Sequence, residues 1–172
     1  MIDVELDIGV VWGNKDFGQR EVEKAVDTAL RLAAIPELAD PVVPVSVSIK
    51  LSDNAEVHAL NQEWRDKDKP TNVLSFPMLD EEELDALLTG TYDAPEIMLG
   101  DIILAYEICA TEAAEKGIPI AHHATHLVIH GMLHLLGHDH IEEEEAELME
   151  ALEVKALASM GLHNPYDDKF DH

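Results

Sequence analysis

The 172-residue chain contains a single cysteine, Cys109. One cysteine cannot form a disulfide within its own chain, and nothing in this usage indicates an oxidising compartment, so we expect a cytoplasmic protein. The first residues, Met1–Trp12, are acidic where a secretory signal would be basic, and charge interrupts their apolar positions. This argues against a cleaved export signal.

Basic residues are also scarce, with 11 Lys and Arg against 36 Asp and Glu, which gives a net charge of −25. Broad, nonspecific attraction to phosphate backbones comes from clustered Lys and Arg, and this composition excludes it. Much of the acidic excess lies in two runs, Asp80–Asp85 and Glu142–Glu153. We interpret both runs as solvated surface rather than as binding sites.

Long apolar runs are almost absent. One stretch, Gly117–His138, has no Asp, Glu, Lys or Arg over 22 residues, which is long enough to cross a bilayer. It also holds six histidines and Pro119. Burying so many imidazoles in lipid is costly, so the stretch predicts a buried helix of a soluble protein with no membrane partner.

The chain has 47% hydrophobic residues, enough for a core, and no repeat or Gly/Ser linker divides it, so we expect one domain over residues 1–172. Periodicity predicts four strands, at Val4–Trp12, Pro41–Lys50, Asn72–Met78 and Glu96–Glu107. It predicts helices at Asp16–Ile35, Ser52–Trp64, Ile108–Gly117 and Ile141–Met160, and one more helix that ends at Gly137. An acidic loop or partial helix is expected at Leu79–Pro95. The prediction is an α/β fold of the α+β type, with a mixed sheet of about four strands and four to five helices.

The stretch "HLVIHGMLHLLGHDH" contains the strongest functional pattern. His130 and His134 are four residues apart, which places both imidazoles on one face of a helix. Gly137 can end that helix in a left-handed conformation and let His140 fold back to the same point. The frame H-x-x-x-H-x-x-G-x-x-H matches the metal-binding frame of the metzincin peptidases at every ligand and at the glycine, and it predicts one Zn²⁺ per chain, although other divalent transition metals also suit three imidazoles. His138 is awkwardly placed to coordinate as well, and Asp139 is a candidate to orient a ligand imidazole.

One position departs from the peptidase signature. Gly131 stands where those enzymes have the glutamate that serves as general base. The metal frame is therefore complete but the proteolytic base is missing, so a metallopeptidase is a weak alternative. The other histidines of this region, His122, His123 and His126, lack such a frame, and we expect them at the helix surface or in the core.

The eleven residues "HGMLHLLGHDH" resemble the H-G-x-L-H-L-x-G-H-D-H motif of the YbeY family of bacterial metal-dependent endoribonucleases. The segment "LNQEWRDKDKPTNVLSFP", Leu60–Pro77, is similar to the family's N-x-x-W-R-x-x-D-x-P-T-D-V-L-S-F-P block, and "LGDIILAYE", Leu99–Glu107, resembles its L-G-D-I strand. These blocks lie in the middle and C-terminal two-thirds of the chain. Asn72 departs from the pattern, because the family often has an acidic residue there.

The resemblance implies a zinc-type site at His130, His134 and His140, and a single-strand-specific endoribonuclease that acts on RNA rather than DNA. It implies maturation of the 3′ end of small-subunit 16S ribosomal RNA, ribosome quality control, and ribosomal proteins as partners. It also implies an essential arginine, here Arg65, so the expected catalytic residues are Arg65 and His130. A noncatalytic ribosome-assembly factor with a closed, structural metal remains the alternative.

The chemistry of phosphodiester cleavage agrees with Arg65, because a guanidinium can hold two phosphoryl oxygens as negative charge develops. Lys67 and Lys69 extend it into a basic patch, which predicts a small positive surface beside the metal. The alternative is a surface arginine paired with Asp66 or Asp68. Two further candidates are weaker: Ser75 is a cleft contact or an ordinary strand serine, and Asp101 orients a ligand or caps local structure.

Overall fold

The computed structural model describes residues 2–13, 17–33, 43–89, 91–137, 143–162 and 164–166. Its sheet has four strands in the order β1-β2-β4-β3: β1 (Ile2–Ile8), β2 (Val45–Ser52), β3 (Val73–Pro77) and β4 (Ile97–Ala105). The pairs β1–β2 and β2–β4 are parallel, whereas β3 is antiparallel to β4. The predicted mixed four-stranded sheet is therefore confirmed.

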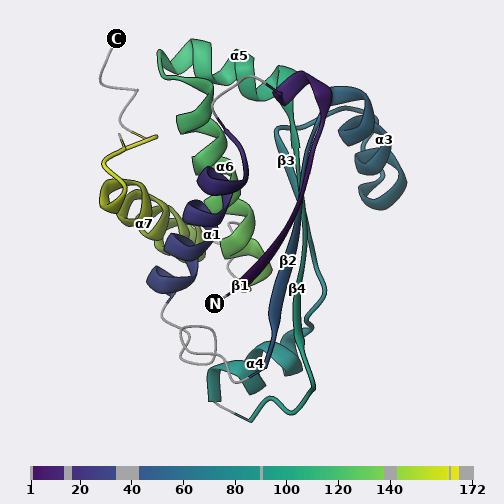
Figure 1. The fold of residues 1–172 in the computed structure, drawn as a ribbon, viewed down its shortest axis with the longest axis vertical. Helices are drawn as coiled ribbons and strands as arrows, with labels where there is room; N and C mark the ends of the chain where they lie inside the picture. Colours follow the sequence, from purple (N-terminus) through teal and green to yellow (C-terminus); the bar gives the residue numbers. More distant parts are fainter. Residues whose placement is uncertain are drawn as a thin grey trace.

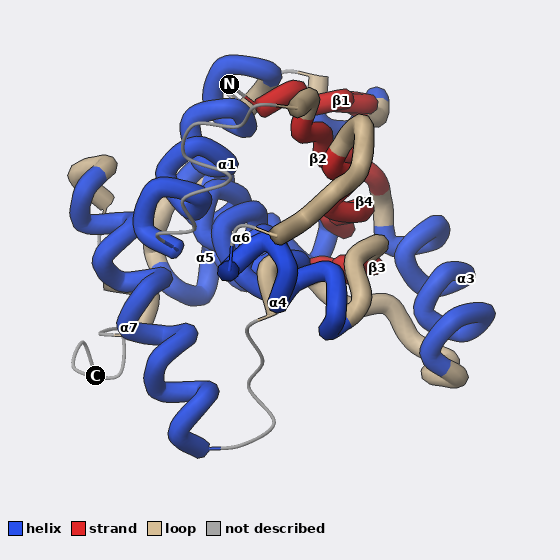
Figure 2. The backbone as a smooth tube through the Cα atoms, turned by 90° about the horizontal axis from the view of Figure 1, so that it is seen from below, coloured by secondary structure: helices blue, strands red, loops and turns tan. Residues whose placement is uncertain are grey.

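The helices cover the two faces of the sheet unequally (Figures 1 and 2). One face packs against α6 (Ile120–Leu135), which in turn contacts α1 (Gln19–Ala33), α5 (Tyr106–Lys116) and α7 (Glu143–Ser159). On the other face, α3 (Asn54–Arg65) packs against β3 and β4. Adjacent residues of β4 serve the two sides, since Ile102 belongs to the main core and Ile103 to a smaller cluster with Val57 of α3. No helix among the described residues combines the length and the apolar character that a membrane span needs.

Two local differences from the predicted elements have clear causes. The expected first strand is too long, because the amide of Gly9 donates to the carbonyl of Leu51 and residues Val10–Trp12 then form a short 3-10 helix, η1, with the Trp12 indole bonded to the Ser52 carbonyl. The acidic segment expected as a loop or partial helix contains α4 (Glu81–Thr89). Its start is a reciprocal capping pair, in which Asp80 and Glu83 each accept the other's amide. With α4 the described residues hold six α-helices, more than the four to five expected.

Candidate active site

Two histidines of α6 lie side by side at the surface of the fold. The ring centroids of His130 and His134 are 4.7 Å apart, and both side chains are partly exposed. The helix ends at Leu135, and Gly137 follows with φ of 98°, the left-handed conformation predicted for this glycine. The rest of the motif lies outside the described residues: His138, Asp139 and His140. Within the described ranges no group of three His, Cys, Asp or Glu is placed to hold a metal ion.

A cleft of about 580 Å³ joins these histidines to the basic patch of the sequence. Arg65 ends α3, Lys67 and Lys69 follow in the next loop, and all three are exposed. The cleft is lined by these three cations, by both histidines and by residues of β3 and the loop before it, including Ser75 and Asn72. In a chain of charge −25, this cleft is a local concentration of positive charge.

Buried contacts fix the basic loop against α3. Asn61, only 2% exposed, donates from its side-chain amide to the carbonyl of Lys69 at 2.8 Å, and its own carbonyl accepts the amide of Lys67. The helix ends because Asp66 adopts a left-handed conformation, with φ of 56°. These contacts hold Arg65 and the two lysines at the mouth of the cleft.

The structure does not support the paired-surface interpretation of Arg65. The carboxylate of Asp68 lies 2.7 Å from Nε2 of His58 instead, and no carboxylate of the described residues forms an ion pair with Arg65. The guanidinium is thus available to an anionic ligand in the cleft.

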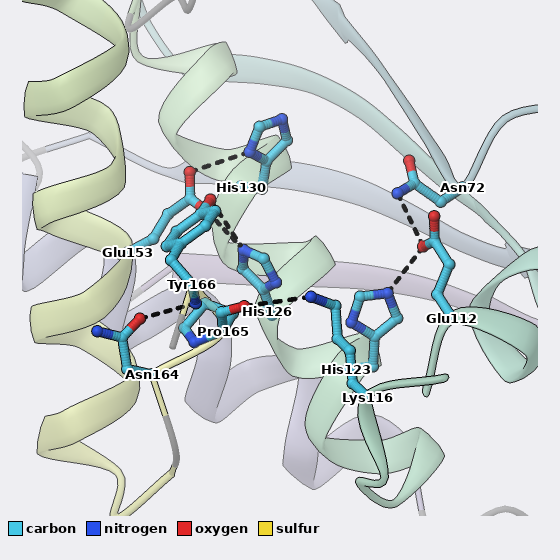
Figure 3. A network of polar contacts seen from close by, with 10 residues as sticks. All are labelled: Asn72, Glu112, Lys116, His123, His126, His130, Glu153, Asn164, Pro165 and Tyr166. Atoms are coloured by element: carbon cyan, nitrogen blue, oxygen red, sulfur yellow. Dashed lines mark hydrogen bonds and ion pairs between the residues drawn. The ribbon is translucent and has the colours of Figure 1, made fainter. Parts of the chain in front are cut away.

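Beside His130 lies a buried carboxylate, Glu153 of α7, whose side chain is 1% exposed (Figure 3). Its Oε2 accepts a hydrogen bond from Nδ1 of His130 at 3.0 Å. Its Oε1 accepts one from the hydroxyl of Tyr166 at 2.6 Å and another from Nε2 of His126. The three donors come from α6 and from the segment after α7, so the carboxylate joins both to the site.

The charge state of this group follows from its surroundings. Burial alone would raise the pKa of Glu153, but the hydrogen bonds from His126 and His130 outweigh it and lower the pKa to about 2. Burial lowers the pKa of His126, and burial together with the Glu153 charge raises the pKa of Tyr166. At neutral pH an ionised carboxylate therefore faces a neutral His126 and a protonated phenol.

The interpretation of Glu142–Glu153 as solvated surface is wrong for its last residue. The described glutamates before it are exposed, as expected. Glu153, however, shares the buried face of α7 with Met149, Ala156 and Leu157. Glu153 comes four residues after Met149, three before Ala156 and four before Leu157, and this helical spacing is the one signal in the sequence that could have identified it, because it places a carboxylate within an apolar stripe. His126, also buried, falls in the core, one of the two places expected for it.

Gly131 shows why the peptidase glutamate has no place in this protein. A Cβ at this position would lie 3.0 Å from two side-chain carbons of Ile102 on β4. The position faces the sheet, where α6 approaches it closely, so a longer side chain would enter the apolar core. The metallopeptidase alternative therefore lacks its base for a steric reason as well as a sequence one.

Two weaker candidates separate in space. Ser75 lines the cleft with the histidines, whereas Asp101 is exposed and lines a different hollow with residues of β1, β2 and α3.

Asn72 donates from its amide nitrogen to Oε1 of Glu112 at 3.0 Å, a bond that an ionised acidic residue could not make. His123 donates to the same oxygen, and this hydrogen bond lowers the pKa of Glu112.

Chemically, the cleft combines two neighbouring imidazoles with exposed cations. Neutral imidazole nitrogens are ligands for divalent transition metals, and His130 already has its Nδ1 on a carboxylate, as metal-bound histidines usually do. The residues described thus fit a metal ion beside a site for an anionic substrate.

Comparison with known proteins identifies the family. Residues 11–161 match the family model described as endoribonuclease YbeY. Similar proteins, each named endoribonuclease YbeY, include those of Rhizorhabdus wittichii (49% identical, 96% of this chain and 97% of the relative), Novosphingobium aromaticivorans (52%, 95% of both) and Erythrobacter litoralis (56%, 92% and 91%). The solution structure of TM1509 from Thermotoga maritima matches with a TM-score of 0.55 and 25% identity, over 94% of this chain and 92% of that one. This chain belongs to the YbeY endoribonuclease family.

Proposed function

We propose that the protein is a cytoplasmic, metal-dependent endoribonuclease that cleaves single-stranded RNA, with the 3′ end of small-subunit 16S ribosomal RNA as its substrate. Family membership supports the reaction class. The observation that carries the proposal is the shared cleft, in which Arg65, Lys67 and Lys69 lie with His130 and His134 although the chain as a whole is strongly acidic.

We assign the metal to His130, His134 and His140, with one Zn²⁺ per chain. A bound ion would supply a Lewis acid for a phosphoryl oxygen or for an attacking water. Arg65 would hold two oxygens of the scissile phosphate and stabilise the charge that develops there, and the lysines would hold neighbouring phosphates as point charges. The hydroxyl of Ser75 is a further donor in the same cleft.

The charge distribution also suggests how substrate is found. A positive cleft on a body of charge −25 attracts phosphate only at short range, because the surrounding acidic surface repels the rest of a nucleic acid. We therefore infer that contacts with ribosomal proteins or the folded ribosomal particle supply much of the affinity. Tight, salt-insensitive binding to bare duplex RNA would contradict this inference.

The test is cleavage of small-subunit ribosomal RNA, naked and within ribosomal particles, together with the metal content of the purified protein. Arg65→Ala should keep its fold and its metal but lose about 10²–10³-fold in cleavage rate, the usual effect of removing one charge-stabilising group. His130→Ala should lose both metal and cleavage. Arg31→Ala is the matched control, since Arg31 is exposed on α1 outside the cleft and its loss should change neither.

The noncatalytic alternative predicts a different outcome. If the wild type holds metal but cleaves neither form of the RNA, or if Arg65→Ala cleaves as well as the wild type, the metal is structural and the protein an assembly factor. In that case removal of the metal should also unfold the domain, which circular dichroism would show.

A further inference from the structure

We propose that Glu153 is a positioning residue that fixes the ring of His130 and directs its Nε2 to the metal; this inference rests on the metal site of the proposed function. Glu153 comes from α7, 23 residues after His130 in the chain, and its carboxylate points toward the His130 ring on α6 (Figure 3). Its Oε2 lies 3.0 Å from Nδ1 of His130, and the side chain is 1% exposed.

The hydrogen bond determines which nitrogen of the ring is protonated. Oε1 of Glu153 already accepts the hydroxyl proton of Tyr166, so the carboxylate acts as an acceptor and Nδ1 of His130, 3.0 Å from Oε2, is the donor. In a neutral imidazole the proton is then on Nδ1, and Nε2 keeps its lone pair. Removing Glu153 removes this constraint on the tautomer, so a smaller share of the neutral rings would carry the lone pair on Nε2.

Glu153 is itself held rigidly. Tyr166 and His126 both donate to Oε1, which leaves Oε2 for His130 alone. The rings of His126 and His130 also meet edge to face, with centroids 6.4 Å apart. The carboxylate therefore has a fixed orientation before any ion binds, as a preorganised site requires.

Stability alone does not account for a carboxylate at this position. Glu153 occupies the apolar stripe of α7, where Met149 and Leu157 pack into the core. The hydrogen bonds from His126, His130 and Tyr166 outweigh the cost of burying the charge, but replacing a whole buried polar group of this kind by apolar side chains is often neutral or stabilising. The bond to Nδ1 of His130 accounts for an acceptor at this position.

The experiment measures the affinity of Zn²⁺ by competition with a chelator, the visible spectrum of the Co²⁺-substituted protein, and the ring nitrogen chemical shifts of His130 in the metal-free protein. Glu153→Gln should weaken Zn²⁺ binding by about 10–100-fold and give His130 a mixed tautomer. Glu150→Gln is the matched control, because Glu150 lies on the same helix but is exposed, and it should change nothing. Tyr166→Phe removes one support of Glu153 but not its bond to His130, so its effect should be smaller than that of Glu153→Gln.

The outcomes separate the two proposals. Unchanged Zn²⁺ affinity and an unchanged His130 tautomer in Glu153→Gln would overturn the positioning role while leaving the metal site intact. If the wild type binds no divalent metal, or His130→Ala binds it equally well, the metal site falls and the positioning role with it. Should Glu153→Gln not fold, Glu153→Asp gives the same test, since a carboxylate one carbon shorter keeps the charge but draws back from His130.

Discussion

Replacing Gly131 by alanine tests the close approach of α6 to the sheet, on which the shape of the site depends. The added methyl would lie 3.0 Å from two carbons of Ile102 and 3.2 Å from a third. Carbon atoms in ordinary contact are about 3.5–4.0 Å apart, so Ile102 or the helix must move by about 0.5 Å. Ile102 is 1% exposed and surrounded by core residues, which leaves it no open side to move toward.

The expected magnitude is a balance of two effects. Overpacking a filled core costs about 1–3 kcal/mol. Alanine is also a better helix residue than glycine by about 1 kcal/mol, which opposes this cost. We expect Gly131→Ala to lower the free energy of unfolding by about 1 kcal/mol, a fall of about 2–4 °C in Tm for a chain of this size.

The effect of Gly131→Ala on the free energy of unfolding should change sign when Ile102 is shortened. Ile102→Ala removes all three carbons that the new methyl would meet, so in that background Gly131→Ala should stabilise by about 1 kcal/mol, the helix-propensity gain. The coupling free energy between the two positions is then about 2 kcal/mol. Urea denaturation of the four proteins in chelator, followed by circular dichroism, measures it without a contribution from bound metal. Additive effects, or stabilisation by alanine in both backgrounds, would refute the steric argument.

Two further predictions concern ionisable groups. Burial raises the pKa of the Cys109 thiol to about 12, so a thiol reagent at about pH 8 should label the folded protein far more slowly than the urea-unfolded chain, and equal rates would contradict its burial. The pKa of Glu112 is lowered from 4.5 in the folded state, so its contribution to stability is present above 4.5 and is lost as the pH falls through the folded pKa. Glu112→Gln should therefore flatten the loss of stability between about pH 5 and pH 3 in denaturation curves, and an unchanged slope would exclude this role.

Local sequence signals were enough for most of the fold. The alternation of Val45, Val47, Ile49 and Leu51 predicts β2, and the capping aspartate before α3 fixes where that helix begins. Strand order was beyond such signals, because the pairing of β4 between β2 and β3 depends on contacts distant in the chain. The acidic α4 was predicted only as a loop or partial helix for a related reason, since its capping pair is weak evidence unless the helix finds a surface to pack on.

For the candidate site, too, local sequence patterns predict some residues, whereas others depend on contacts distant in the chain. His130 and His134 follow from helical spacing alone, and Arg65 was identified through the resemblance. Glu153 was missed because its charge suggested solvent, whereas packing of α7 against α1 and α6 buries it. No pattern in the sequence indicates a role for Tyr166, since its contact with Glu153 depends on how the chain turns back after α7.

The surroundings of α6 also suggest why a chain with the histidine pattern of a peptidase family would cleave RNA instead of a peptide. In the peptidase signature the residue after the first histidine is a carboxylate that acts as a base. Here that position faces Ile102 so closely that a side chain as long as glutamate would enter the apolar core, and the helix cannot present an anion to the cleft from there. The carboxylate that does reach a cleft histidine, Glu153, is buried beside His130, and the cleft itself is lined by Arg65 and two lysines. A cleft lined by these cations, with the carboxylate buried beside His130, favours a substrate that brings its own negative charge, as a phosphodiester does and a peptide bond does not.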